Sequence, residues 1–468
     1  MPNATTENLV KNLKSALRRS PAEGGDLAMT AALRGQHPAD IAEAFRELAR
    51  PEALAVFSWL DNAHAAEVLD DIDPELVRYI LDNAPPERIA ELLDRMPMDE
   101  AAEVISEADP DMAEILLEDL TERAPEDAAE VRELLSYPEY SAGRLMTDKF
   151  VRLKSGMTVE QAWETVRKAD PEVETLTDLY VVEPMRSGGH ADERLVGVLS
   201  LRDLVRAKGN QLIADVMTPD PITVQVDTDQ EEVAKMFSKY DFLALPVLDH
   251  SGALAGIVTV DDVVDVLEEE HSEDVLALGA VTTAGDEASY LSTSVTRTVR
   301  RRVWWLLLLF LASTLTGAVI TRFEDELARV VALSIFIPLL IGTGGNAGSQ
   351  TVTTVIRAMA VGEIRLKDWL RVLARELCAG LTLGLLLAAV GFVFVNVGWQ
   401  KEAEVALVVS LSLVAIVAWA TIVGSLLPLA ASRLGLDPAV MSAPFISTFV
   451  DATGLFLYFT IARIILGI

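Results

Sequence analysis

Five long apolar segments fill the last third of the chain, and they constrain its fold more than any other feature. They span about Val303–Ile320, Val330–Val355, Leu377–Trp399, Val405–Ala431 and Ala443–Ala462. A helix crosses the hydrocarbon core of a bilayer with about 20 mostly apolar residues. Each segment therefore predicts a membrane-spanning helix, and residues 303–468 are expected to form a five-helix domain in a lipid bilayer.

Charge sets this region apart from the rest of the chain. The 468 residues include 71 acids and 39 bases, for a net charge of −32, but from Val303 onward ten acids balance ten bases. Residues 1–302 thus carry the whole negative charge. Such a surface argues against nucleic acid as a partner, because phosphate has the same sign. It favours the binding of divalent cations instead.

Loop charges predict the orientation in the membrane. Four bases lie in residues 365–375, between the second and third apolar segments, whereas the acids of residues 324–326 lie in the opposite class of loop. Basic loops stay on the cytoplasmic side. We therefore expect a multi-pass protein of the cell membrane, with residues 1–302 in the cytoplasm and the C-terminus outside. The polar N-terminus carries no signal peptide, which agrees with that orientation.

Cysteine and histidine offer no metal chemistry of the zinc type. Cys378 is the only cysteine, and the five histidines are scattered without ligand spacing. An internal disulfide and a thiolate or zinc site are therefore not expected. No catalytic triad, phosphoryl-transfer loop or metal-hydrolase motif is evident either, so we do not expect an enzyme.

Residues 1–136 predict an all-α domain of stacked helical hairpins. Apolar residues recur at steps of three and four, as at Ile41, Ala44, Phe45 and Leu48, which is the period of an amphipathic helix. Prolines separate the helices at Pro38, Pro51, Pro74, Pro85-Pro86, Pro97 and Pro110.

Residues 137–267 contain an internal repeat of short strands and helices. Met146-Thr147 opens one copy and Met217-Thr218 the next; Gly197–Ser200 closes the first and Gly256–Thr259 the second. The arrangement resembles a tandem pair of α/β CBS domains. The hydroxyl and acidic groups at the two helix starts either bind the ribose or phosphate of an adenine nucleotide or only cap those helices.

Residues 268–302 are expected to form a connecting helix. It begins with the acidic run Glu268–Asp274 and ends with Arg300–Arg302 beside Trp304-Trp305. Bases followed by an aromatic pair are typical of the cytoplasmic edge of a bilayer.

Asp451 lies near the centre of the fifth apolar segment, with no other charge in Ala443–Ala462. A carboxylate at this depth costs about 2.5–3.5 kcal/mol even on the mildest insertion scale. Either a cation path needs the charge, or Asp451 is a protonated or hydrogen-bonded structural residue.

The second apolar segment contains a glycine-rich run, Ile341–Thr351. It does not fit a phosphate-binding loop, because no lysine follows the glycines. We expect the run to break the helix and line a polar cavity; the alternative is that its small residues permit close helix packing. With Pro444 and Gly454 on either side of Asp451, segments two and five are expected to line one path.

Oxygen ligands near this path suit a hard cation. The neutral candidates are Thr343, Asn346, Ser447 and Thr448. Magnesium dehydrates reluctantly and keeps several waters, so we expect outer-sphere contacts to Asp451.

Asp437 lies in the short loop before the fifth segment, on the predicted cytoplasmic side. We expect it to meet the acidic connecting helix. Two such faces repel one another unless a divalent ion bridges them, which predicts a gate that closes as the cytoplasmic cation concentration rises.

Together these features resemble the MgtE magnesium channels, in the family's order and over almost the whole chain. The carrying motifs are the tandem CBS repeat, Gly342-Thr-Gly-Gly-Asn-Ala-Gly348, Asp437-Pro-Ala439 and Asp451-Ala-Thr-Gly454. The resemblance implies a homodimer with five membrane helices per subunit, a central magnesium pore and magnesium-sensing cytosolic domains.

The resemblance also implies functional residues. The pore site would be Asp451, and the regulatory magnesium ligands would be Glu67, Asp99, Glu103, Asp229, Glu231, Asp241, Asp262, Asp265, Glu270, Glu273, Asp274 and Asp437. ATP is a candidate second ligand, at Ser200, Arg202, Asp203, Phe242 and Thr259. Asp178 departs from the family's pattern, since nucleotide-binding members place an aromatic residue there, and this weakens the ATP assignment.

The sequence thus predicts a magnesium-selective channel for influx, which magnesium itself closes from the cytoplasm. The alternative is a membrane-anchored sensor of magnesium or nucleotide that transports nothing. The unpaired Asp451 and the glycine-rich run favour transport.

Overall fold

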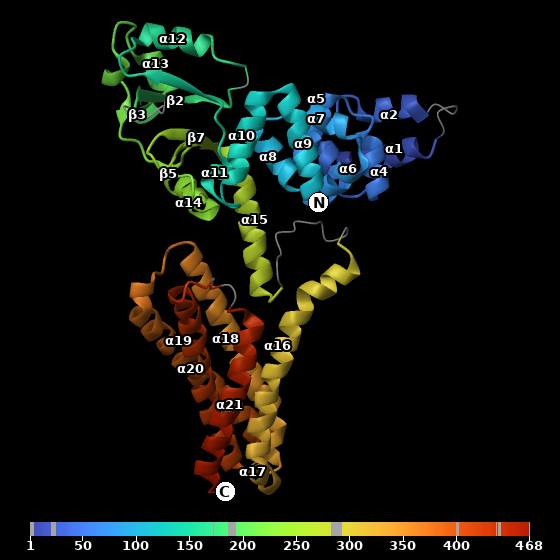
Figure 1. Ribbon diagram of the computed structural model, residues 1–468. Helices are drawn as coiled ribbons and strands as arrows, with labels where there is room; N and C mark the ends of the chain where they lie inside the picture. Colours follow the sequence, from blue (N-terminus) through green and yellow to red (C-terminus); the bar gives the residue numbers. More distant parts are fainter. Residues whose placement is uncertain are drawn as a thin grey trace. The chain divides into compact units, whose positions relative to one another are not determined.

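The computed structural model describes residues 4–19, 25–171, 173–185, 193–281, 293–398, 402–436, 438 and 441–467. The chain divides into two units (Figure 1). The first contains residues 1–270 and 286–292, and the second contains residues 271–285 and 293–468.

Among the described residues, helices α1 to α10 form the N-terminal part of the first unit, and the spacing of apolar residues predicted a helical domain here. Proline occupies the first position of α3, α6, α7, α9 and α10, where its fixed φ suits a helix and its missing N–H has no partner to lose. Their bounds are α1 (Ala4–Leu17), α2 (Gly25–Leu33), α3 (Pro38–Phe45), α4 (Arg50–Phe57), α5 (Asn62–Asp71), α6 (Pro74–Asn83), α7 (Pro86–Leu93), α8 (Met98–Ser106), α9 (Pro110–Arg123) and α10 (Pro125–Ser136).

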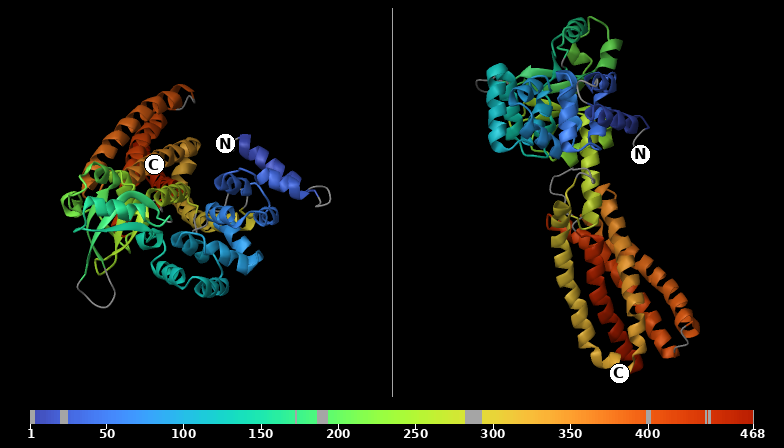
Figure 2. Two further views of the ribbon diagram at one scale, coloured as in Figure 1. Left: turned by 90° about the horizontal axis from the view of Figure 1, so that it is seen from above. Right: turned by 90° about the vertical axis from the view of Figure 1, so that its right-hand side faces the viewer.

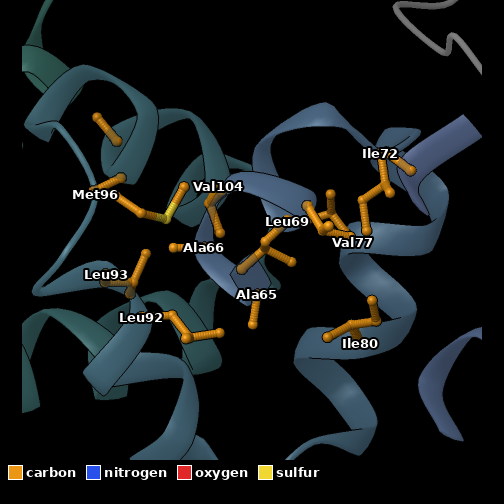
Figure 3. Packing of buried hydrophobic residues seen from close by; sticks show 14 of the residues in the cluster. Ala65, Ala66, Leu69, Ile72, Val77, Ile80, Leu92, Leu93, Met96 and Val104 are labelled. Atoms are coloured by element: carbon orange, nitrogen blue, oxygen red, sulfur yellow. The ribbon is translucent and has the colours of Figure 1, made fainter. Parts of the chain in front are cut away.

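These helices stack as an array. Alternate helices contact one another, α3 with α5, α5 with α7, and α7 with α9, while α4 contacts α6. Figure 3 shows apolar side chains from α5, α6, α7 and α8 meeting in the shared core. Leu69, Ile80 and Leu92 are each 0% exposed there.

Two small sheets follow in the same unit and confirm the predicted α/β repeat. In the first copy, Phe150–Lys154 pairs parallel with Thr175–Pro184, which pairs antiparallel with Glu193–Ser200. In the second copy, Val224–Gln225 pairs parallel with Ala244–Leu248, which pairs antiparallel with Leu254–Thr259. The first copy contains α11 (Ala142–Leu145), β1 (Phe150–Lys154), α12 (Val159–Arg167), β2 (Thr175–Pro184), β3 (Glu193–Ser200) and α13 (Leu201–Arg206). The second contains η2 (Ile213–Asp215), β4 (Thr218–Pro219), β5 (Val224–Gln225), α14 (Gln230–Tyr240), β6 (Ala244–Leu248), β7 (Leu254–Thr259) and α15 (Val260–Leu278).

Each copy pairs with the opening residues of the other. Val198 of β3 pairs with Thr218, which opens the second copy, and Ile257 of β7 pairs with Thr147, which opens the first. Glycine makes both approaches possible: a Cβ would lie 2.6 Å from Met217 Sδ at Gly197 and 2.8 Å from Met146 Cγ at Gly256. The glycine repeated in each copy therefore allows that copy to pair closely with the opening residues of the other.

The connecting helix has other bounds than the sequence predicted. It is α15, which starts at Val260 as the last helix of the second CBS copy and ends at Leu278. Gly279 follows, and Ala280 takes a left-handed φ of 57°, which ends the helix. The basic triplet Arg300–Arg302 belongs instead to α16, the first apolar helix.

The second unit contains five helices long and apolar enough to cross a membrane, among the residues that the structure describes. Figures 1 and 2 show them running side by side, and α20 contacts α18, α19 and α21. The bounds in this unit are α16 (Val295–Arg322), α17 (Glu324–Arg329), α18 (Ala332–Ala360), η3 (Leu366–Asp368), α19 (Trp369–Val393), the π-helical turn η4 (Phe394–Gly398), α20 (Ala403–Arg433) and α21 (Ala443–Leu466).

The predicted break in the second apolar segment is wrong. Helix α18 continues through the whole glycine-rich run, from Ala332 to Ala360. A Cβ at Gly344 would lie 2.6 Å from Ile416 Cγ2 of α20, and one at Gly348 would lie 2.9 Å from Ile446 Cγ2 of α21. The small residues thus allow three helices to pack closely, which was the alternative interpretation.

Candidate metal sites

Asp451 lies in the third turn of α21, and its side chain is half-buried. Helix α21 starts at Ala443, has Pro444 in its first turn and passes Gly454 without interruption. Among the described residues, none forms a hydrogen bond or an ion pair with Asp451. Its own helix therefore sets the position of this carboxylate.

Gly345 of α18 lies directly against this carboxylate. A Cβ at Gly345 would lie 3.6 Å from Asp451 Oδ1 and 2.5 Å from Ser447 Oγ. Ser447 precedes Asp451 by four residues, so both side chains lie on one face of α21. The second and fifth apolar segments therefore meet at Asp451, although both are continuous helices.

The other neutral oxygens predicted for this path behave differently. Thr343 Oγ1 donates to Leu339 O at 2.7 Å, and Thr448 Oγ1 donates to Pro444 O at 2.9 Å. Each hydroxyl thus bonds within its own helix, which leaves only its lone pairs for another partner. Asn346 is exposed on α18.

Hydrogen bonds to two neighbouring helices fix the position of α21 around Asp451. Trp419 of α20 donates its indole N–H to Thr453 Oγ1 at 2.9 Å. The buried Tyr458 donates its hydroxyl to Leu333 O of α18 at 3.0 Å. Both bonds lie among apolar groups, where an unmade hydrogen bond costs about 1–3 kcal/mol, so they favour one rotation of α21.

A second acidic site lies within the first unit, where α5 and α8 of the helical array come near α15 of the CBS pair. Asp262 raises the pKa of Asp99, and Asp99 and Asp262, both predicted ligands, raise that of Asp70. Asp99 Oδ1 is buried and has no hydrogen-bond partner. Such crowding of buried carboxylates is an electrostatic setting that a cation relieves.

Burial is the main cause of the raised pKa values in this group, and neighbouring carboxylates are the second. Burial and then Glu103 raise the pKa of Asp70 to about 8, and burial and then Asp70 raise that of Glu100 to about 9. Burial and then Asp262 raise the pKa of Asp99 to about 7. The pKa of Asp262 rises only to about 6, because Thr259 donates a hydrogen bond that favours its charged form.

Other predicted ligands lie at the edges of this group. Glu67 is exposed on α5 and contributes to the raised pKa of Asp71, and Asp71 in turn contributes to that of Asp265 on α15. Glu103 on α8 acts on Asp70. Among the described residues, no three His, Cys, Asp or Glu side chains lie close enough together to hold a metal ion by themselves.

Four further predicted ligands have local roles in the first unit. Asp229 caps α14 by accepting from the Glu231 N–H at 2.9 Å, and Glu231 pairs with Lys235 at 2.5 Å. Asp241 ends α14 with a φ of 56°, and Glu270 accepts from Gln230 Nε2 at 2.9 Å. These contacts explain the residues locally without a metal.

Three predicted ligands remain. Glu273 and Asp274 lie further along α15. Asp437 falls outside the residues that the structure describes, so its expected meeting with the acidic connecting helix has no structural account.

Of the two hydroxyls predicted to bind nucleotide, Ser200 caps a helix and Thr259 bonds to a carboxylate at the start of a helix. Ser200 Oγ accepts from the Asp203 N–H at 3.1 Å and donates to Asp203 Oδ2 at 2.6 Å. Thr259 Oγ1 donates to Asp262 Oδ2 at 2.7 Å.

Arg202 is exposed, and the Phe242 ring stacks on Tyr240 with centroids 5.4 Å apart. Asp178 pairs with Ser200 across β2 and β3, and burial raises its pKa. When charged, this carboxyl beside Ser200 would repel phosphate.

Comparison with known proteins agrees with this architecture. The model of a family described as divalent cation transporter (MgtE) matches residues 337–461, the MgtE intracellular N domain matches residues 36–140, and the CBS domain matches residues 142–210 and 213–269. The magnesium transporter MgtE of Thermus thermophilus is 42% identical over 470 residues, which cover 98% of this chain and 99% of that protein. The chain belongs to the MgtE family.

Two further relatives are similar over part of the chain. The magnesium transporter MgtE of Enterococcus faecalis is 35% identical over 337 residues, 72% of each protein. The solved structure of the cytosolic domain of the Mg²⁺ channel MgtE in complex with ATP is 40% identical, covering 55% of this chain and 99% of that one, with a TM-score of 0.49. The MgtE family is one of membrane transporters and not of enzymes.

Sequence reasoning missed several acids that lie where the helical array meets the CBS pair within the first unit. Asp70 and Glu100 are the most affected by their surroundings, and Glu174 acts on Glu100 from the loop before β2. Glu130 of α10 interacts with Asp148 and lies 3.8 Å from Lys149 Nζ. In the sequence each resembles an ordinary solvated helix acid, and nothing in the local pattern distinguishes them.

Proposed function

We propose that this chain conducts Mg²⁺ into the cell along a path beside Asp451, and that Mg²⁺ bound to its acidic cytosolic domains closes the path. The proposal of a conduction path rests on Asp451. It is half-buried in a membrane helix, without a bonded partner among the described residues, and it faces Gly345. A carboxylate tolerated there without a partner is expected to serve an ion.

Several features support a hydrated Mg²⁺ ion as the cargo. Only one carboxylate lies at this point of α21, with the Ser447 hydroxyl beside it. Mg²⁺ usually keeps most of its waters and binds proteins through one or two carboxylates. The relatives from Thermus thermophilus and Enterococcus faecalis carry the name magnesium transporter, which agrees with this cargo.

The deciding experiment measures magnesium uptake in a magnesium-auxotrophic host. We expect Asp451→Ala and Asp451→Asn to abolish growth at low magnesium. Asp368→Asn is the control, because it removes another carboxylate of the same unit. Asp368 lies in η3 and pairs with Arg371 at 3.2 Å. If both Asp451 variants support growth like the wild type, the pore assignment fails, and a sensor without transport becomes the better reading.

The gating part rests on the carboxylates of α5, α8 and α15. Burial is the first cause of their raised pKa values, and neighbouring carboxylates add to it, so their negative charges oppose one another across this interface. A bound cation offsets this repulsion, so Mg²⁺ favours the closely packed state of the first unit. Among the described residues no three acids lie close enough together to hold a metal ion by themselves, so we propose that the ions bind with their waters, at Asp99, Asp262 and the acids around them.

Proteolysis of the full-length protein tests the gate. We expect Mg²⁺ to slow cleavage in the first unit several-fold for the wild type, and much less for Asp99→Asn/Asp262→Asn. Glu164→Gln is the control, since that acid pairs only with Lys168 on the surface of α12. Equal protection of the wild type and the double variant would contradict the assignment.

Three further elements complete the proposal. The basic residues 365–375 support a cytoplasmic first unit and an outer C-terminus, which cysteine labelling from either side of the membrane tests. A homodimer is expected from family membership, and chemical crosslinking in membranes tests it.

ATP binding at Arg202, Asp203 and Phe242 is tested by nucleotide titration of wild type against Asp203→Asn, with loss of affinity as the expected result.

A further inference from the structure

The first helix of the chain carries a basic hollow that the transport function does not use. Residues 11–19 contain four bases and no acid, within a region whose net charge is strongly negative. An open hollow of about 710 Å³ lies beside this helix, and all four bases, Lys11, Lys14, Arg18 and Arg19, line it.

The hollow is built on a firmly packed helix. Leu9, Val10 and Leu13 of α1 are at most 5% exposed, and α1 contacts α2, α3 and α4. Thr6 Oγ1 donates to Glu43 Oε2 of α3 at 2.7 Å, and Lys14 Nζ donates to Glu47 O at 2.9 Å. The folded helical array thus holds the α1 bases at one wall of the hollow.

The hollow keeps a net positive charge. Among the described residues, no acid forms an ion pair with Lys11, Arg18 or Arg19, although the region is rich in acids. Glu7 and Glu47 also line the hollow, so four bases face two acids there. In so acidic a protein, a concentrated and unpaired positive surface requires its own explanation.

We propose that the hollow beside α1 binds a phosphate-bearing anion. Phosphate carries about −1.5 to −2 charges and three acceptor oxygens near pH 7. Arginine matches it with parallel N–H donors, and lysine adds point charges. The hollow has the volume of a small-molecule site. The phosphate groups of a soluble polyphosphate and of an anionic lipid headgroup share this chemistry.

A fluorescence experiment on the full-length protein separates these two sources. Ser15 is exposed and lines the hollow, so a fluorophore on Ser15→Cys in a Cys378→Ser background reports on its occupancy. In the soluble arm, inorganic tripolyphosphate is added to protein in zwitterionic nanodiscs, with EDTA present to remove Mg²⁺. In the lipid arm, the protein is reconstituted in phosphatidylglycerol nanodiscs without tripolyphosphate.

We expect a saturable response in at least one arm, and at least a ~10-fold weaker one in Lys11→Gln/Arg18→Gln. The double variant Arg34→Gln/Lys168→Gln removes two exposed bases elsewhere and should respond within ~2-fold of the wild type. Salt should weaken the response, because exposed charges are screened. The proposal is overturned if neither arm responds, or if the α1 variant keeps the wild-type response. An unchanged melting temperature of the α1 variant excludes misfolding as the cause of a loss.

Discussion

The packing of α18 against α20 leads to a sharp test with two glycines. At Gly424 of α20, a Cβ would lie 2.8 Å from the backbone oxygen of Gly348 and 3.1 Å from Thr351 Cβ. At Gly342 of α18, it would meet nothing within 4 Å. Both positions are helical, so Gly→Ala changes the same backbone propensity at each site.

The difference between the two variants isolates the steric effect. Each substitution gains up to about 1 kcal/mol from helix propensity, and this gain cancels in the comparison. Only Gly424→Ala pays for overpacking, which costs about 1–3 kcal/mol, because a backbone oxygen cannot rotate away. We expect Gly424→Ala to melt about 2–12 °C below Gly342→Ala, at about 2–4 °C per kcal/mol.

Tryptophan fluorescence during heating of the purified protein measures this difference. Gly317→Ala in α16 is a second control, since its Cβ would also be free of contacts. Equal melting temperatures for Gly424→Ala and Gly342→Ala would refute the close approach of α18 and α20. A specific loss at Gly342 would instead support an irregular backbone in the glycine-rich run.

Three further predictions follow from the described contacts. Because the carboxyl pKa values are raised, the folded first unit binds more protons than the unfolded chain between about pH 4 and 9. Without metal, its stability therefore falls as the pH rises through this range. Mg²⁺ should raise its melting temperature more at about pH 8.5 than at about pH 6, and the opposite order would contradict this. Ser447→Ala should reduce magnesium uptake less than Asp451→Asn does, whereas Thr460→Ala, whose hydroxyl only bonds Phe456 O, should leave uptake unchanged. Leu69→Ala, in a fully buried position, should lower the free energy of unfolding by about 2–5 kcal/mol, and Leu27→Ala, at a side chain 79% exposed, should change it little.

Much of the fold was predictable because its signals are local. The length and hydropathy of the five apolar segments are enough to predict membrane helices, and five such helices are present among the described residues. Prolines such as Pro38 and Pro74 begin helices, because the ring suits a first turn and excludes an interior one. The CBS repeat was visible because both copies keep the same Gly and Ser/Thr spacing before a helix.

The glycine-rich run is a segment whose structure the local sequence did not predict. Its residues are compatible both with a loop that lines a cavity and with a closely packed helix, because glycine permits either. The decision depends on Ile416 and Ile446, which come from helices far along the chain and fit against Gly344 and Gly348. A sequence pattern does not contain that information.

The acidic interface was harder to predict for a related reason. Asp99 and Asp262 were expected from resemblance, but Asp70 and Glu100 were not, although burial and mutual repulsion raise their pKa values most. Each follows an ordinary helix pattern for a surface acid. Their special character arises only when α5, α8 and α15 come together, so it depends on tertiary packing and not on any motif.

The two acidic sites differ in a way that separates their proposed tasks. At Asp451 a single carboxylate lies beside a hydroxyl, and a cation held by so few groups leaves quickly, as conduction requires. In the first unit carboxylates raise their neighbours' pKa values, and among the described residues no three of them form a metal site by themselves, so we expect each proposed ion to be held weakly. A gate built from weak sites responds over the range where free Mg²⁺ competes with protons for the same oxygens. The raised pKa values of Asp70, Asp99 and Glu100 place that competition near neutral pH, and the closing of the path should therefore depend on pH as well as on magnesium.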